Sequence, residues 1–503
     1  MIFYFILSNA ATFRPSHPSN LWNTKRWDDR NMVFSSLNFI FIFLPIFFTL
    51  YTICPGRWKN LCLFAGSLAF YFYGIREHPF YLALLVLSIL VNYRLGIKLG
   101  QKRQKINKGR WLAAGIIYNL SWLFLFKYSG FFAGNINQLF SWAGISLSVP
   151  VFNMILPVGI SFYTFQAISY LVDVYRKDAP YETSFINFGM YICMFPQLIA
   201  GPIVTYSSIR RQISRRRHTV INIEDGLREF TIGLGLKVLL ANQIGGLWSQ
   251  VGAIGYDSIS TPLAWLGLTA FSLQIYFDFY GYSLMAKGLG RLMGFSLPDN
   301  FSHPYTAVSM TEFWRRWHMT LGSWFREYVY IPLGGNRKGS LRSILNLSAV
   351  WLLTGFWHGA SWNFILWGAV LFVLITVEKL GMSRILSRIP PLGHAYMMLA
   401  IALTWLVFAV TDLSQTAVYF QRLFPILAPD RHFTYYSGDV FKYGKLYFIS
   451  IAAGFLFMTD LPARIYHRVK YRLISAAALL AIFWLCIYCM KMGADDPFLY
   501  FRF

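Results

Sequence analysis

The chain has 503 residues, of which 56% are hydrophobic, 19% aromatic and only 13% charged, whereas an average soluble domain carries about 25% charged residues. Lysine and arginine outnumber aspartate and glutamate by 45 to 21, which gives a formal net charge of +24. Because long apolar runs recur from Leu37 to Met490, this composition excludes a secreted, fibrous or disordered chain. It predicts an all-α polytopic membrane protein.

The basic residues gather in short loops between the apolar runs, at 94–110, 210–217, 287–291 and 464–472. Such loops stay on the cytoplasmic side of a membrane, because lysine and arginine resist translocation. The charge excess is therefore explained by the orientation of the loops in the membrane, and no nucleic-acid partner is predicted. Some of these charges remain available to attract an anionic cytosolic substrate.

The first 31 residues differ in character from the rest of the chain, since the short apolar run Ile2–Leu7 has no basic segment before it and residues 12–31 are polar. They are either an N-terminal extension or the product of an upstream start codon. Residues 32–503 are expected to form one membrane domain. Eleven to thirteen crossings are predicted, at residues 37–54, 58–74, 80–97, 111–126, 151–175, 185–204, 227–244, 262–285, 344–357, 364–379, 397–411, 446–458 and 473–490.

Two of these regions do not look like simple spans. Pro196, Gly201 and Pro202 interrupt the run at 185–204, and a broken segment is tolerated at membrane depth only where it is buried in protein or lines a cavity. The runs at 344–357 and 364–379 are short and closely joined, as in a hairpin that need not cross fully.

The loop at 311–339, TEFWRRWHMTLGSWFREYVYIPLGGNRKG, differs from the others. Its aromatic and apolar residues recur at steps of three and four, with arginines between them. This spacing predicts one amphipathic helix at the cytoplasmic interface, which ends at Pro332 and Gly334–Gly335.

Ionisable groups inside apolar runs are costly and mark candidate functional sites. His358 lies between Trp357 and Trp362 where two apolar runs meet, and histidine can accept and return a proton near neutral pH. The neighbouring small residues would let a substrate or another helix approach the ring; the alternative is a neutral histidine bonded to a carbonyl in a packed turn. His318 is either a second catalytic group or a solvated interfacial contact, and Asp278 is a carboxylate in the middle of an apolar run.

Signatures of soluble enzymes, such as GxSxG, HExxH and GxxxxGK[ST], do not occur in the sequence. We expect base-assisted transfer without a serine nucleophile, with no metal and no bound cofactor.

Six ordered segments resemble the membrane-bound O-acyltransferase family, and within it the branch of the bacterial alginate O-acetyltransferase membrane subunit. The resemblance covers residues 32–503, and the six segments are LPVGISFYTFQAISYLVDVYRK (156–177), FPQLIAGPIV (195–204), QIYFDFYGYSLMAKGLGRLMGFSLPDNFSHPY (274–305), EFWRRWHMTLGSWFREYVYIPLGGNRKG (312–339), TGFWHGASWNFILWG (354–368) and PFLYFRF (497–503). The resemblance implies about 11 transmembrane helices around a funnel, with re-entrant or interfacial helices on the cytoplasmic side.

The resemblance also implies roles for individual residues. His358 matches the family's membrane histidine and would be the general base on the acceptor hydroxyl. His318 matches the second histidine and would orient or polarise the thioester. Asn363 occupies a position from which an amide would orient the imidazole. Asp278 and Trp357 would support the site, and the donor phosphates would be held by Arg315, Arg316, Arg326 and Lys338.

The function implied is transfer of an acetyl group from a cytosolic thioester, acetyl-CoA, toward hydroxyls of an extracytoplasmic polysaccharide in the bacterial inner membrane. The polymer is an alginate-like exopolysaccharide or a cell-wall glycan. The expected partner is an SGNH-type protein, periplasmic or membrane-anchored, whose serine or tyrosine is an alternative immediate acceptor. Leu284 stands where the alginate branch commonly has aspartate, which leaves a D-alanyl-type transferase open. A non-enzymatic polysaccharide exporter is a further alternative, against which the absence of repeated halves argues.

Overall fold

The computed structural model describes residues 33–101, 107–152, 154–199, 201–428, 435–493 and 499, and these residues form helices and no strand. The predicted N-terminal extension lies outside the described residues. Six helical stretches in the described part are long and apolar enough to cross a membrane: Phe80–Gly100, Val220–Ile254, Trp362–Arg388, Pro390–Ala409, Asp439–Phe457 and Leu473–Lys491. The all-α, multi-pass prediction is confirmed.

Most predicted spans coincide with helices. They are α3 (Lys59–Gly74), α4 (Phe80–Gly100), α5 (Lys108–Leu123), α13 (Thr261–Leu292), α16 (Ser340–His358), α17 (Trp362–Val377), α19 (Pro390–Ala409), α21 (Asp439–Phe457) and α23 (Leu473–Lys491). The first span is a π-helix, η1 (Phe39–Phe43), continued by α2 (Leu44–Ile53). The span at 227–244 is part of a longer unit made of α11 (Val220–Gly235), the π-helix η4 (Leu236–Ala241) and α12 (Asn242–Ile254).

Two predicted spans are shorter than expected. Only Ile160–Arg176 of the run at 151–175 is helical (α7), because the chain before it turns through Gly159 in a left-handed conformation with φ of 74°. The run at 185–204 is broken, as predicted, into α8 (Phe185–Cys193) and α9 (Phe195–Leu198). The break lies at Met194, ahead of Pro196, because proline disfavours helical backbone in residues before it and fits the first turn of the next helix.

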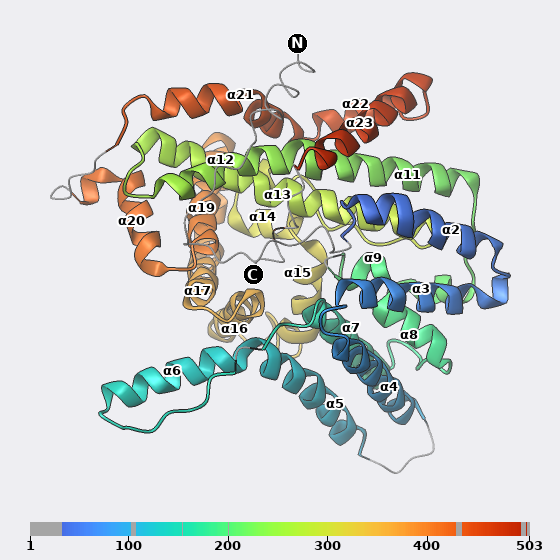
Figure 1. Ribbon diagram of the computed structural model, residues 1–503. Coiled ribbons are helices and arrows are strands. Elements are labelled where there is room, and N and C mark those ends of the chain that lie inside the picture. The colour runs from blue at the N-terminus through green and yellow to red at the C-terminus, as the bar shows by residue number, and fades with distance from the viewer. Residues whose placement is uncertain are drawn as a thin grey trace.

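The amphipathic loop is not one helix, which corrects the prediction. It forms α14 (Met310–Arg316), α15 (Met319–Phe325) and the π-helix η6 (Arg326–Tyr330), with a break at Trp317–His318. Other short helices in loops were not predicted: α6 (Ser129–Trp142), α10 (Tyr206–Ser214), α18 (Ser383–Arg388), α20 (Leu413–Leu423) and α22 (Leu461–Val469). Figure 1 shows α14 and α15 near the middle of the molecule, with α17 and α19 on one side and α7 and α8 on the other.

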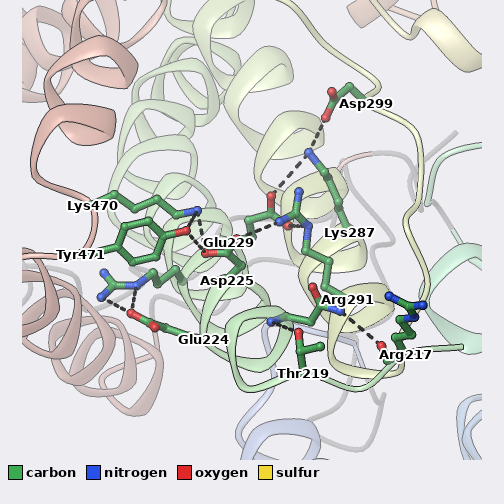
Figure 2. Close-up of polar contacts among 12 residues, drawn as sticks. Arg217, Thr219, Glu224, Asp225, Glu229, Lys287, Arg291, Asp299, Lys470 and Tyr471 are labelled. Carbon is green, nitrogen blue, oxygen red and sulfur yellow. Dashed lines mark hydrogen bonds and ion pairs between the residues drawn. The ribbon is translucent and has the colours of Figure 1, made fainter.

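Two basic loops that were predicted to be cytoplasmic meet at one end of α11 and α13 (Figure 2). Asp225 of α11 accepts ion pairs from Arg291 at 3.2 Å and from Lys470 at 2.6 Å. Glu229, one turn further, pairs with Lys287 at 3.4 Å and with Arg291 at 3.1 Å. The contacts bring the C-terminal end of α13, where residues 287–291 are helical and not a loop, together with the connection between α22 and α23.

Deep between the same helices, Lys237 of η4 and Asp278 of α13 form an ion pair of 2.5 Å, and each side chain is only 2% exposed. The second carboxylate oxygen, Oδ2, accepts the backbone N–H of Leu499 at 2.7 Å. The pair therefore attaches a residue near the C-terminal end of the sequence to the helix core.

We expect Asp278→Asn to lower the free energy of unfolding by about 3–5 kcal/mol, because it leaves the Lys237 ammonium buried without its counter-charge. The double variant Lys237→Met/Asp278→Asn removes both charges and keeps an acceptor for the Leu499 N–H, so it should recover most of the loss. Thermal unfolding in detergent would measure both variants. Equal unfolding temperatures for the wild type and Asp278→Asn would contradict this account.

Candidate active site

A cavity of about 1210 Å³ lies between α7, the α14–α15–η6 segment and α16. It exceeds the roughly 300–1,000 Å³ of ordinary small-molecule pockets. Both predicted histidines, His318 and His358, line it, although they lie on different helices and only 3% and 8% of their respective surfaces are exposed. Exposed arginines also line the cavity, so it joins buried imidazoles to a basic region accessible to solvent.

His318 has a left-handed backbone conformation, with φ of 43°, at the break between α14 and α15. The neighbouring loop holds the break in place, because Met319 N–H donates to the Asn300 carbonyl at 3.0 Å and Ser302 N–H donates to the Arg316 carbonyl at 3.0 Å. A non-glycine residue in this conformation is uncommon, and such strain is tolerated where surrounding contacts determine it. Here the break turns the imidazole into the cavity.

Asn300 also fixes the protonation of His318. Its Oδ1 accepts the backbone N–H of Thr320 at 3.4 Å and the Thr320 hydroxyl at 3.0 Å, while its Nδ2 donates to the Ser283 hydroxyl at 3.2 Å. Because a backbone N–H can only donate, the atom facing it is the oxygen. The same oxygen lies 2.9 Å from His318 Nδ1, so Nδ1 carries the proton. In the neutral ring, Nε2 then has a free lone pair, and among the described residues it has no hydrogen-bond partner.

His358 is the last residue of α16, where the chain turns sharply into α17. The two helices touch backbone to backbone: a Cβ at Gly355 would lie 2.3 Å from the Phe364 carbonyl oxygen, and one at Gly368 would lie 2.5 Å from that of Trp351. Among the small residues noted in the sequence, Gly355 allows another helix, α17, to come close. The imidazole still reaches the cavity from this tight junction.

Aromatic rings enclose both imidazoles. The Trp357 ring centroid lies 4.9 Å from that of His358 and 6.3 Å from that of His318, so this tryptophan stands beside both histidines. Trp367 and Phe408 lie 5.1 and 5.2 Å from the His358 ring. These rings form apolar walls beside the two imidazoles.

The role predicted for Asn363, orienting the imidazole, stays a prediction, and the structure shows a second role for its amide. It is fully buried, and its Nδ2 donates to the carbonyls of Val407 at 3.2 Å and Phe408 at 3.3 Å. These carbonyls lie at the C-terminal end of α19, where the last turn of a helix has unpaired acceptors. Asn363 thus joins α17 to α19.

The predicted donor-binding cations divide into two groups. Arg315 and Arg326 are exposed and line the cavity. Arg316 instead pairs with Glu312 and donates to the Thr306 hydroxyl, and neither it nor Lys338 lines the cavity. Asp278 is also absent from the lining, since its carboxylate is engaged by Lys237.

Sequence reasoning missed two residues of the site. Arg176 lines the cavity, lies with its guanidinium 5.8 Å from the Tyr328 ring centroid and donates to the Glu327 carbonyl at 3.2 Å. Its only signal in the sequence is a cation directly after the α7 span, which is equally typical of a residue that sets membrane topology. Asn300 lies in the SLPDNFSHPY segment, and its role depends on a contact that spacing does not reveal.

Among the described residues, no three histidine, cysteine or carboxylate side chains gather closely enough to hold a metal ion.

Comparisons with known proteins place these features in a family. The model of the membrane-bound O-acyltransferase family matches residues 176–414, which include both histidines. The chain is 38% identical over 395 residues to the "Probable alginate O-acetylase AlgI" of Pseudomonas putida, covering 78% of this chain and 80% of the relative.

The names of two further relatives refer to cell-wall polymers. The chain is 37% identical over 384 residues to a peptidoglycan O-acetyltransferase of Helicobacter pylori, covering 69% of this chain and 70% of the relative. It is 26% identical over 288 residues to a teichoic acid D-alanyltransferase of Bacillus subtilis, covering 54% of this chain and 69% of the relative. The chain therefore belongs to the membrane-bound O-acyltransferase family and is a multi-pass membrane O-acyltransferase.

Proposed function

We propose that this enzyme transfers an acetyl group from acetyl-CoA toward hydroxyls of an extracytoplasmic polysaccharide, across the bacterial cytoplasmic membrane. The observation that carries the proposal is one cavity lined by two buried histidines and by exposed arginines. Imidazoles supply proton transfer, and arginines bind phosphates. The acetylating relatives, at 37–38% identity, favour acetyl transfer over D-alanyl transfer, for which the corresponding relative is 26% identical.

His358 is the general base of this reaction. Its ring takes the proton of the acceptor hydroxyl as the hydroxyl oxygen attacks the thioester carbonyl carbon. The C–S bond then breaks and the leaving thiolate receives the proton, so the products are an O-acetyl ester and CoA thiol. The aromatic walls around the ring keep water from competing with the acceptor.

His318 orients the donor but does not polarise its carbonyl. With the proton on Nδ1, the neutral ring presents a lone pair at Nε2. A lone pair accepts a hydrogen bond from an N–H or O–H group, whereas polarising a carbonyl needs a donor. The amide N–H groups of the pantetheine arm are suitable partners.

The donor phosphates bind Arg176, Arg315 and Arg326, in place of the set expected from sequence. Completion of the reaction requires an SGNH-type partner, periplasmic or membrane-anchored, which takes the acetyl group on a serine or tyrosine or passes it to the polymer. The polymer is an alginate-like exopolysaccharide or a cell-wall glycan, in keeping with the named activities of the relatives.

We expect His358→Gln to lower the rate of acetyl transfer from radiolabelled acetyl-CoA in membranes by at least about 10²-fold, because the general base is lost. His467→Gln is the matched control, since His467 is exposed on α22. Equal rates for His358→Gln and the wild type would remove His358 from the mechanism. Transfer of D-alanine but not acetate by the wild type would favour the D-alanyl alternative.

Replacing Asn300 tests the His318 protonation. Asn300→Leu releases the Nδ1 proton from its acceptor, so we expect kcat to fall by about ten- to a hundredfold, since an incorrect imidazole tautomer impairs catalysis. Asn300→Asp retains an acceptor for both Nδ1–H and the Thr320 N–H and should stay within about threefold of the wild type. Equal losses in the two variants would contradict a role in the tautomer.

Alanine variants of Arg176, Arg315 and Arg326 should each raise the KM for acetyl-CoA by about tenfold or more, because each loses charge-assisted hydrogen bonds to phosphate. Lys338→Ala, outside the cavity lining, is the control. With S-acetyl-pantetheine, which lacks the phosphates, the differences between the arginine variants and the wild type should disappear. Persistence of the KM effects with this donor would assign the arginines a different role.

A further inference from the structure

The backbone at the end of α16 receives hydrogen bonds from outside the helix. The last carbonyls of a helix have no donor within it. Here the carbonyl of Phe356 accepts the Tyr128 hydroxyl at 3.0 Å, and Lys127 Nζ donates to the carbonyls of Trp357 at 2.5 Å and His358 at 3.2 Å. Three successive carbonyls, ending at His358 itself, are satisfied by two neighbouring residues.

The two donors come from the π-helix η3 (Phe124–Tyr128), which connects α5 to α6. The Tyr128 ring stacks on Phe356 with centroids 4.0 Å apart, and Lys127 Nζ lies 5.7 Å from the Trp357 ring centroid. Further along, Asn135 of α6 accepts the Trp362 indole N–H at 3.0 Å, where α17 begins. The η3–α6 segment thus holds both sides of the turn that carries His358.

The need to satisfy the last carbonyls of α16 does not by itself explain why residue 127 is a lysine. A charged side chain within apolar runs is costly, and Tyr128 shows that a neutral hydroxyl is sufficient to satisfy a carbonyl here. The lysine differs in that one ammonium group bridges two consecutive carbonyls. It therefore fixes the peptide that joins Trp357 to His358, and with it the direction in which the imidazole leaves the helix.

We propose that Lys127 is a positioning residue for acyl transfer, which holds the His358 backbone and the Trp357 ring in the geometry that proton transfer requires. The proposal rests on the proposed role of His358 as general base. Small errors in the position of a reacting group are costly, and a displacement of about 1 Å can lower a rate by about 10²-fold.

The test measures kcat and KM for acetyl-CoA in membranes that contain the enzyme, its partner and the acceptor polymer, together with thermal unfolding of the purified enzyme. For Lys127→Met and Lys127→Gln we expect kcat to fall by about ten- to a hundredfold with KM changed less than about twofold, because the donor-binding arginines are untouched. Lys127→Arg keeps the charge and can donate to both carbonyls, so its kcat should exceed that of Lys127→Gln by about tenfold. Tyr128→Phe removes one neutral cap and should alter kcat by less than about threefold.

Three results would overturn the proposal. The first is a wild-type kcat in folded Lys127→Gln, and the second is an equal loss of kcat in Lys127→Arg and Lys127→Gln. The third is failure of both Lys127→Met and Lys127→Gln to fold, which would assign the lysine to stability alone. His358→Gln is measured alongside. If His358→Gln keeps wild-type activity, the proposed function fails; if His358→Gln loses activity while Lys127→Gln keeps it, only the positioning role of Lys127 fails.

Discussion

Polar groups removed from water must find their partners inside the protein, and in a membrane this constraint decides where the backbone can leave a regular helix. At the break between α8 and α9, side chains and backbone of the protein supply these partners. The Phe195 N–H donates to the Ser67 hydroxyl at 3.2 Å, and the Tyr191 hydroxyl donates to the Val204 carbonyl at 3.0 Å. At the break beside His318, the loop that contains Asn300 supplies the hydrogen-bond partners of the backbone. At both breaks, the irregular backbone is therefore surrounded by protein.

Both cavity histidines lie at places where the backbone leaves a regular helix. His318 lies at a helix break and His358 at a helix end, so each imidazole extends from a point where the chain changes direction. Trp357 lies beside both rings and closes the space between them. The two breaks are also linked, because the Thr320 hydroxyl that donates to Asn300 accepts the Ile203 N–H at 3.0 Å, which ties the α14–α15 junction to the segment after α9.

Much of this arrangement could be predicted from single segments. The spans followed from the length of apolar runs, the break before Pro196 from its prolines, and His358 from the rarity of an ionisable group among tryptophans. The break inside the WRRWH segment could not be predicted, because its helical period continues across His318 and only tertiary contacts to Asn300 and Ser302 interrupt it.

Hydrogen-bond and ion-pair partners on distant segments also could not be predicted from the sequence. The amide of Asn363 donates to carbonyls of Val407 and Phe408 in α19, more than forty residues further along the chain, and its spacing in the sequence gives no sign of this contact. Arg316 and Arg315 are neighbours in sequence, yet only Arg315 lines the cavity because Glu312 and Thr306 hold Arg316. Lys127 stands immediately after a predicted span, where a lysine is ordinarily a marker of the span's end.

The direct backbone contact of α16 with α17 at Gly355 and Gly368 has a mechanical consequence. Two helices locked at this distance cannot slide or part without losing the contact, so they behave as one stiff wall with His358 fixed to its edge. Any widening of the cavity then falls to its other walls, α7 and the α14–α15–η6 segment. The cavity thus has one wall whose spacing is set by main-chain contact, and that wall carries the His358 imidazole.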